Sequence, residues 1–267
     1  MKRGLIPLTV ALLFCAGGFA GAQFNIPSIP NPFADKPSTP KNPSNVPIDG
    51  ISDMVKGASG ISLPDELKIG GAVAVDIVSR NGGLVEDEAM TRRVALIGKS
   101  LSSYCTRPEL NFRFGILDSD SINAYSAPGG YVFITRGLYN SVQDDRQLAA
   151  VLAHEISHIT RRHALKIISR NEFMKGLFTT GDAVANVSAF DSGVASISNT
   201  LMGKGFDPDV EYDADKAGRS LAAKAGYPRD ALLDFLTQLY QAKGDSKSTF
   251  NTHPPLSHRI ERLKKSS

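Results

Sequence analysis

The feature that most constrains this chain is a pair of histidines one helical turn apart, in His154-Glu155-Ile156-Ser157-His158. The flanking residues are largely apolar, which predicts a helix buried in the core. Residues four apart lie about 40° apart around a helix, so both imidazoles leave the same face. Three polar side chains in one buried turn are costly without partners, and a shared cation would supply one.

Two imidazoles at this spacing can both reach one zinc ion at about 2.0–2.1 Å. Glu155 would then take the proton of a zinc-bound water as that water attacks a carbonyl. The alternative is an ordinary helix whose polar residues are satisfied by their neighbours. His163 lies about 140° round the same helix from His158, so we expect it on the surface and not in the site. A third ligand must therefore come from a separate element.

The candidate third ligand is Glu211, in the first turns of a helix that Asp207-Pro208 is expected to open and Gly226 to end. Asp215 lies four residues further on and shares the same face. A carboxylate in that position can hold a ligand histidine in the correct tautomer. A solvated acidic helix start that favours the helix dipole is the alternative, and spacing alone does not decide between them.

The remaining pattern predicts an α+β fold in which one small antiparallel sheet is followed by helices. Residues 72–78 fit either a strand or a helix, and the Gly-, Ala- and Ser-rich residues 176–205 fit either a loosely packed helical excursion or a loop. In chain order, the expected elements are a short helix near 51–55, a helix within 86–104, strands at 110–116, 122–126 and 131–135, and helices over 141–170, 207–225, 229–241 and at the C-terminus.

The first 22 residues have the pattern of a signal peptide, with Lys2 and Arg3, an apolar run and the cleavage-site form Ala20-Gly21-Ala22. Lipidation of Cys15 is disfavoured because the large Phe14 precedes it. An uncleaved membrane anchor is disfavoured because the apolar run is shorter than about 20 residues. Residues 23–49 are rich in Pro, Ser and Asn, which predicts a flexible segment. Residues 50–267 then form the functional domain.

Charge and cysteine content exclude several classes of protein. With 30 basic and 27 acidic residues the formal net charge is only +3, so a nucleic-acid binder is not expected. Two cysteines exclude a disulfide scaffold and a thiolate zinc module.

Four blocks of residues occur in a fixed order along the chain. They are Asn123-Ala124-Tyr125 with Pro128-Gly129-Gly130-Tyr131, then His154-Glu155-x-x-His158, then Glu211-x-x-x-Asp215, and last His253-Pro254 with Arg259. Together they resemble metallopeptidase family 48, the gluzincins that include HtpX and the CAAX prenyl proteases, and within it the soluble periplasmic BepA-like branch. The resemblance covers roughly residues 80–265.

This resemblance implies a zincin-type helical core with the metal-binding motif on a central helix and one Zn²⁺ per chain. It implies His154, His158 and Glu211 as zinc ligands and Glu155 as the catalytic base. It also implies Asp215 as a second acid, often described as a proton donor, whereas the spacing alone places Asp215 behind a ligand histidine.

The resemblance further implies that His253 approaches the zinc from the far side of the domain. There it would stabilise the oxyanion or, by binding zinc, displace the water and block the enzyme; a simple turn before the last helix is the alternative. In zincin-like folds an edge strand pairs with extended substrate. We therefore expect Asn123 and Ala124 to line the cleft, with plain hairpin structure as the alternative.

These expectations describe an exported, periplasmic zinc endopeptidase that hydrolyses peptide bonds of unfolded or misassembled envelope proteins. Its partners are polypeptide substrates and not nucleic acid, while peripheral membrane association and the oligomeric state stay open. The alternative is a zinc-bound chaperone-like or assembly protein whose water site is blocked by His253. No transmembrane helix pair is expected, and no helical-repeat extension after Ser267.

Overall fold

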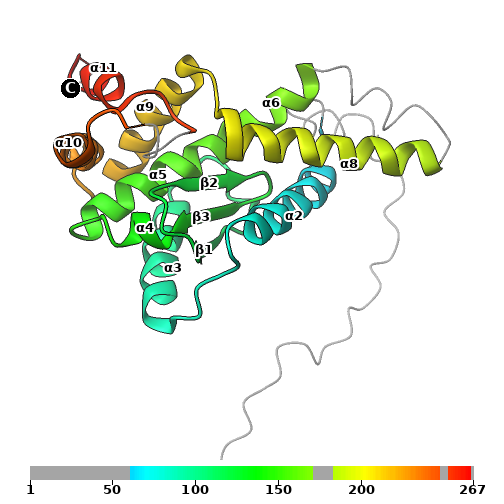
Figure 1. The fold of residues 1–267 in the computed structure, drawn as a ribbon, viewed down its shortest axis with the longest axis horizontal. Coiled ribbons are helices and arrows are strands. Elements are labelled where there is room, and N and C mark those ends of the chain that lie inside the picture. The colour runs from blue at the N-terminus through cyan, green and yellow to red at the C-terminus, as the bar shows by residue number, and fades with distance from the viewer. Residues whose placement is uncertain (1–60, 171–182, 247–251, 266–267) are drawn as a thin grey trace, which may run out of the picture. The chain divides into compact units, whose positions relative to one another are not determined.

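The structure is a computed structural model that describes residues 61–170, 183–246 and 252–265. The expected signal peptide at 1–22, the Pro-rich segment at 23–49 and the helix near 51–55 lie outside the described residues, as does part of 176–205. In the described part, helices surround a small sheet, which confirms the α+β class (Figure 1).

The elements follow one another in the order expected: residues 72–78 lie in a helix, α2, the described part of 176–205 is helical, as α8 and η1, and the short helix α4 was not expected. In chain order they are α2 (Leu63–Arg80), α3 (Glu88–Ser102), β1 (Arg113–Leu117), β2 (Ala124–Ala127), β3 (Tyr131–Thr135), α4 (Arg136–Tyr139), α5 (Asp145–Thr160), α6 (His163–Arg170), α8 (Ala183–Asn199), the π-helix η1 (Thr200–Lys204), α9 (Pro208–Lys224), α10 (Ala231–Lys243) and α11 (Leu256–Lys265).

The sheet is mixed, which corrects the expectation of an antiparallel sheet. Its order is β1-β3-β2, with β2 antiparallel to β3 and β1 parallel to β3. Gly129 and Gly130 have φ angles of 77° and 100°, which allow the tight β2–β3 turn. The hairpin leaves the other edge of β3 free, and β1 pairs there in the same direction. Alternating apolar residues identify the faces of a strand but not its neighbour, so the sequence could not give this order.

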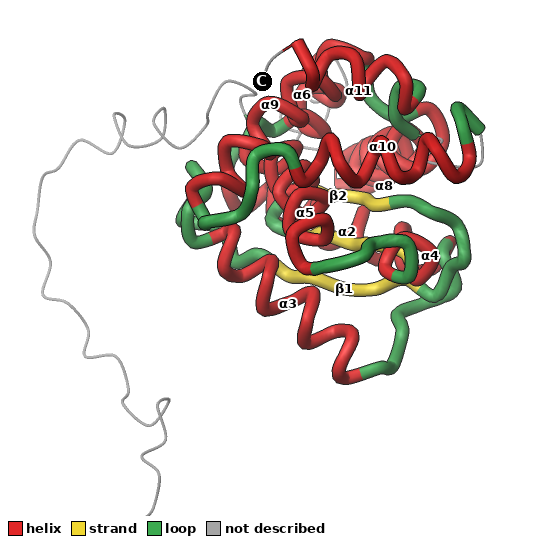
Figure 2. The backbone as a smooth tube through the Cα atoms, turned by 90° about the vertical axis from the view of Figure 1, so that its left-hand side faces the viewer, coloured by secondary structure: helices red, strands yellow, loops and turns green. Residues whose placement is uncertain are grey.

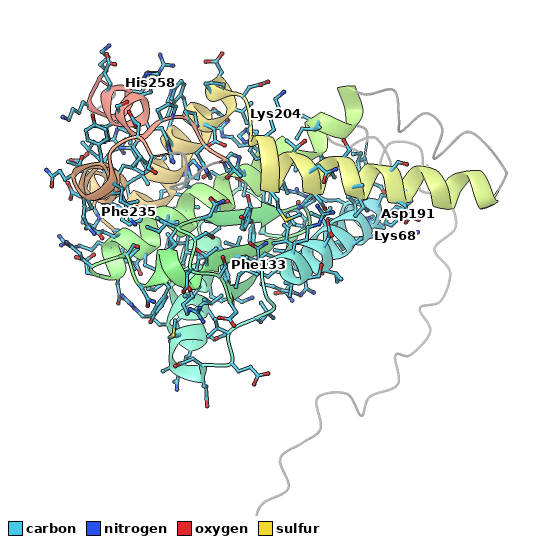
Figure 3. The ribbon with its side chains drawn as sticks, viewed as in Figure 1. Lys68, Phe133, Asp191, Lys204, Phe235 and His258 are labelled. Atoms are coloured by element: carbon cyan, nitrogen blue, oxygen red, sulfur yellow. The ribbon has the colours of Figure 1, made fainter. Side chains whose placement is uncertain are left out.

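The two faces of the sheet belong to two different hydrophobic cores. On β3, Val132 and Ile134 pack with α3, α5, α10 and α11, whereas Phe133 packs with α2, α6, α8 and η1. Figure 3 labels one aromatic ring from each core, Phe235 in the first and Phe133 in the second. Helix α3 lies along β1 (Figure 2), and α8 lies beside α2 (Figure 1). Both faces of the sheet are therefore covered.

The expected single helix over 141–170 is instead two helices, α5 and α6. The Asp144 side chain caps α5 by accepting hydrogen bonds from the backbone of Arg146 and Gln147. The helix ends at Thr160, and Arg162 has a φ of 55°, in the left-handed region. A left-handed residue breaks a right-handed helix, so α6 leaves in a new direction. The apolar pattern continues across the break, which is why the sequence did not reveal it.

Helix α9 packs very closely on α5, and this contact places the later carboxylates beside the histidines. Gly218 makes the contact possible: a Cβ atom there would lie 2.9 Å from the backbone N and Cα of His154. Both backbones are rigid helices, so neither can yield without a shift of the whole element. Among the described residues, no helix is both long and apolar enough to cross a membrane.

Replacing Gly218 with Ala should destabilise the protein by about 1–3 kcal/mol, because the added methyl group forces α5 and α9 apart. Gly71→Ala is the matched control, since a Cβ atom at this helical glycine would meet only the Tyr131 hydroxyl, at 3.5 Å. The control should be neutral or stabilising, because alanine favours a helix over glycine by about 1 kcal/mol. Urea unfolding of both variants measures the difference. Equal stability of the two variants would show that the α5–α9 contact is not tight.

Candidate metal centre

Helix α5 carries His154 and His158 on one face. Both residues are buried, and their Nε2 atoms lie 3.1 Å apart. The two rings meet edge to face, with centroids 4.8 Å apart. The helical spacing in the sequence therefore does bring both ring nitrogens to one point.

Glu211 reaches the same point from the first turns of α9. Its carboxylate oxygens lie 3.4 Å from His154 Nε2 and 3.6 Å from His158 Nε2, and its side chain is fully buried. Neither oxygen has a hydrogen-bond donor at bonding geometry among the described residues. Burying a carboxylate without a partner is costly, so this arrangement calls for a cation.

His253 completes a cluster of four groups, and it comes from the segment between α10 and α11. Its Nε2 atom lies 3.5 Å from Glu211 Oε2, and its side chain is buried. One ligand atom from each of the four residues lies within 4.8 Å of the others. The separations among His154, His158 and Glu211, between 3.1 and 3.6 Å, match the roughly 3.3–3.5 Å between neighbouring ligands of a tetrahedral zinc ion. These residues therefore fit a zinc ion.

Glu155 also faces this cluster from α5, with its Oε1 atom 3.9 Å from His253 Nε2. Burial raises the pKa of its carboxyl group, against the opposing effect of a charged His154. Beside the cluster is a cavity of about 10 Å³, which is space for roughly one water molecule. Its walls include Ala124, Glu155, His158, Phe206, Glu211 and His253.

Behind His154 lies a buried ion pair. The Nδ1 atom of His154 is 2.9 Å from Asp215 Oδ1, and Arg259 of α11 contacts both Asp215 oxygens, at 2.6 and 3.1 Å. Burial would raise the pKa of Asp215, but the Arg259 charge outweighs it and holds the pKa well below its usual range. Burial and Arg259 act to lower the pKa of His154, yet the Asp215 and Glu211 carboxylates raise it to about 9.

The prediction that His163 lies on the surface is wrong. It is buried, and its Nδ1 atom lies 3.0 Å from the Nδ1 atom of His158. The angular argument assumed one continuous helix, whereas the left-handed Arg162 turns the chain back toward His158. Burial lowers the pKa of His163 to about 4. Ala164 and Leu165, which follow His163, are buried as well, but an apolar pattern alone does not show where the helix breaks.

The two residues expected to line the cleft have different roles in the structure. Ala124 lines the cavity at the start of β2. The Asn123 side chain is buried beside it, where its Oδ1 atom accepts hydrogen bonds from the Ala124 backbone and from the Thr252 hydroxyl, at 3.0 and 3.3 Å. The Thr252 hydroxyl also contacts His253 Nδ1, at 3.1 Å. Asn123 thus supports the segment that carries His253.

Comparisons with known proteins agree with this geometry. The family model described as Peptidase family M48 matches residues 88–267. The beta-barrel assembly-enhancing protease of Escherichia coli O157:H7 is 29% identical over 218 residues, which is 77% of this chain and 45% of that protein. The putative beta-barrel assembly-enhancing protease of Vibrio cholerae is 27% identical over 235 residues, 84% of this chain and 48% of that protein.

A mitochondrial relative is also similar. The metalloendopeptidase OMA1 of Bos taurus is 31% identical over 170 residues, 58% of this chain and 32% of that protein. This chain therefore spans about half the length of the bacterial relatives and a third of the mitochondrial one.

Without metal, the free energy of unfolding should fall as the pH rises from about 7 to 9. The folded-state pKa of His154, about 9, lies above the ordinary histidine value of 6.5, so between these two pH values the native state holds a proton that the unfolded chain has lost. The stabilisation from this proton is fully present below pH 6.5 and is lost as the pH rises to about 9. Over this range the free energy of unfolding falls by up to about 1.4 kcal/mol per pH unit.

Urea unfolding in the presence of a chelator, at several pH values in this range, measures the slope. His154→Gln should reduce the slope, and His258→Ala, which changes an exposed histidine of α11, should keep it. A flat profile in the parent chain would contradict a charged His154.

Proposed function

The chain belongs to peptidase family M48, and from this premise we propose that it is a zinc-dependent endopeptidase of unfolded or misassembled envelope proteins. The observation that carries the proposal is the convergence of His154 and His158 on the buried, unsatisfied carboxylate of Glu211. In this proposal the three side chains hold the zinc ion. Zinc, when bound, supplies a Lewis acid that lowers the pKa of water and polarises a carbonyl group.

The other roles follow from the positions of the side chains. Glu155 accepts the proton of the attacking water, and its raised pKa moves it closer to the working pH of a general base. Asp215 accepts a hydrogen bond from His154 Nδ1 and so leaves Nε2 directed at the cluster. Because Arg259 already pairs with Asp215, a role in orienting His154 fits Asp215 better than proton donation to the substrate.

The substrate side of the proposal rests on β2. In the described part of the chain β2 is an edge strand, and Ala124 at its start lines the cavity. An extended peptide could add to this edge through backbone hydrogen bonds. The residues of β2 are buried and η1 packs next to them, so substrate entry requires η1 to move.

Location and substrate class have separate support. The signal-peptide pattern of residues 1–22 supports export to the periplasm. Two relatives carry the name beta-barrel assembly-enhancing protease, which supports clients of the bacterial envelope. The proposal does not extend to the part of those relatives that this chain does not span.

A second candidate function is favoured by His253. With four side chains around one point, zinc would have four protein ligands and no open position, as in a structural site. The protein would then act as a chaperone-like or assembly factor, or as a peptidase held inactive until His253 withdraws. The two variants described next separate these possibilities.

Replacing Glu155 with Gln should lower the rate of casein cleavage by about 10²–10⁴-fold, because the amide cannot accept a proton. Zinc content should stay the same, since Glu155 is adjacent to the ligands and is not one of them. Cleavage is followed by release of labelled peptides and zinc by elemental analysis. Glu261→Gln, at an exposed position of α11, is the matched control. Undiminished cleavage by Glu155→Gln would refute the mechanism.

If His253 blocks the site, as in the second candidate function, replacing it with Ala should increase casein cleavage, because the change removes the fourth group from the cluster and leaves space for water. His258→Ala changes an exposed histidine five residues away and should have no effect. The same cleavage assay, at saturating zinc, compares both variants with the parent chain. A loss of cleavage in His253→Ala would instead assign His253 to stabilisation of the transition state.

A further inference from the structure

His163 is a buried histidine that the proposed reaction does not use. It is the first residue of α6, and the left-handed backbone at Arg162 directs it back toward α5. Its side chain is 2% exposed and meets the His158 ring edge to face, with centroids 5.0 Å apart. A buried imidazole has two nitrogens, and each of them needs a hydrogen-bond partner.

Both nitrogens of His163 have a partner. The Nδ1 atom lies 3.0 Å from His158 Nδ1, and the Nε2 atom lies 3.3 Å from Asp213 Oδ2. Arg161 also contacts this Asp213 oxygen, with its Nε atom at 3.1 Å. The three groups therefore form a chain from His158 through His163 to a carboxylate of α9.

The proton positions along this chain are determined by hydrogen-bond rules. If the Nε2 atom of His158 binds zinc, as proposed, its ring proton lies on Nδ1. That proton is donated to His163 Nδ1, which must then be a bare acceptor. The remaining ring proton of His163 is on Nε2 and is donated to Asp213. One assignment thus satisfies every atom of the chain.

Helix geometry explains why His158 needs an intermediary whereas His154 does not. Glu211 and Asp215 are four residues apart on α9 and share the face that meets α5, and Asp215 contacts His154 directly. Asp213 lies about 200° round the helix from Glu211 and is 38% exposed, so its carboxylate cannot reach His158 itself. The His163 imidazole bridges this gap.

We propose that His163 and Asp213 are positioning residues that hold the His158 ring, in one tautomer and orientation, for metal binding. The inference rests on the proposed zinc site and deepens it. Outer partners of this kind keep a ligand histidine basic and correctly oriented, and their loss commonly weakens metal binding by about 10–100-fold. Helix α9 then supports both ligand histidines, through Asp215 on one side and Asp213 on the other.

The test is the zinc dissociation constant of the full chain, measured by competition with a chromogenic chelator. His163→Ala should weaken zinc binding by about 10–100-fold, and Asp213→Asn should weaken it less, in the same direction. The double variant should be no weaker than His163→Ala, because both changes break one chain. His258→Ala and Asp209→Asn, at exposed positions of α11 and α9, are the matched controls.

A second measurement separates positioning from simple core packing. If His163 only filled space, His163→Ala would lower the Tm in chelator and leave the rise in Tm on adding zinc unchanged, which would overturn the inference. Positioning predicts a smaller rise. Asp213→Asn, at a half-exposed side chain, keeps the test valid should His163→Ala fail to fold. Nitrogen-15 NMR of the His158 ring in the parent chain should show the proton on Nδ1.

The outcomes distinguish the inference from the proposal on which it rests. If the parent chain binds no zinc, the proposed function fails. If the parent chain binds zinc through His154, His158 and Glu211 but His163→Ala and Asp213→Asn bind it with unchanged affinity, only the positioning role fails.

Discussion

The close packing of α9 on α5 is the contact on which the rest of the structure depends. At Gly218, in the middle of α9, the two backbones come nearer than any side chain would permit, and this contact fixes the position of α9 on α5. Its first turns then place Glu211 against both ligand histidines and Asp215 behind one of them. The sheet, α3 and α10 cover the other faces of α5 and keep water out. A metal centre built from two helices needs no flexible loop for its three protein ligands.

Burial gives this centre its chemical character. In an interior without water, each ionisable group is either paired or destabilised, and the structure contains both cases. Asp215 is paired with Arg259, and it can therefore stay charged and hold His154. Glu155 Oε1 and both Glu211 oxygens have no hydrogen-bond partner among the described residues, and burial raises the pKa of both carboxyl groups. The difference between a satisfied carboxylate and two unsatisfied ones marks where a cation belongs.

Sequence reasoning predicted the parts of the site that depend on local periodicity. Helical spacing placed His154 and His158 on one face and grouped Glu211 with Asp215, and the structure has these placements. It failed where distant segments meet. The order of the strands, the break after α5 and the inward turn of His163 all depend on which surface packs on which, and an apolar pattern does not encode this. The position of His253 followed only from family resemblance.

The single left-handed residue between α5 and α6 has a consequence for how this region can vary. A substitution at Arg162 by a residue that readily adopts the left-handed region, such as Gly or Asn, keeps both the turn and the length of the connection, so the His163 ring still faces α5. An insertion or deletion there would rotate that ring by about 100° for each residue and move it along the axis. The junction therefore restricts both composition and length, and engineered insertions into this domain are better placed elsewhere.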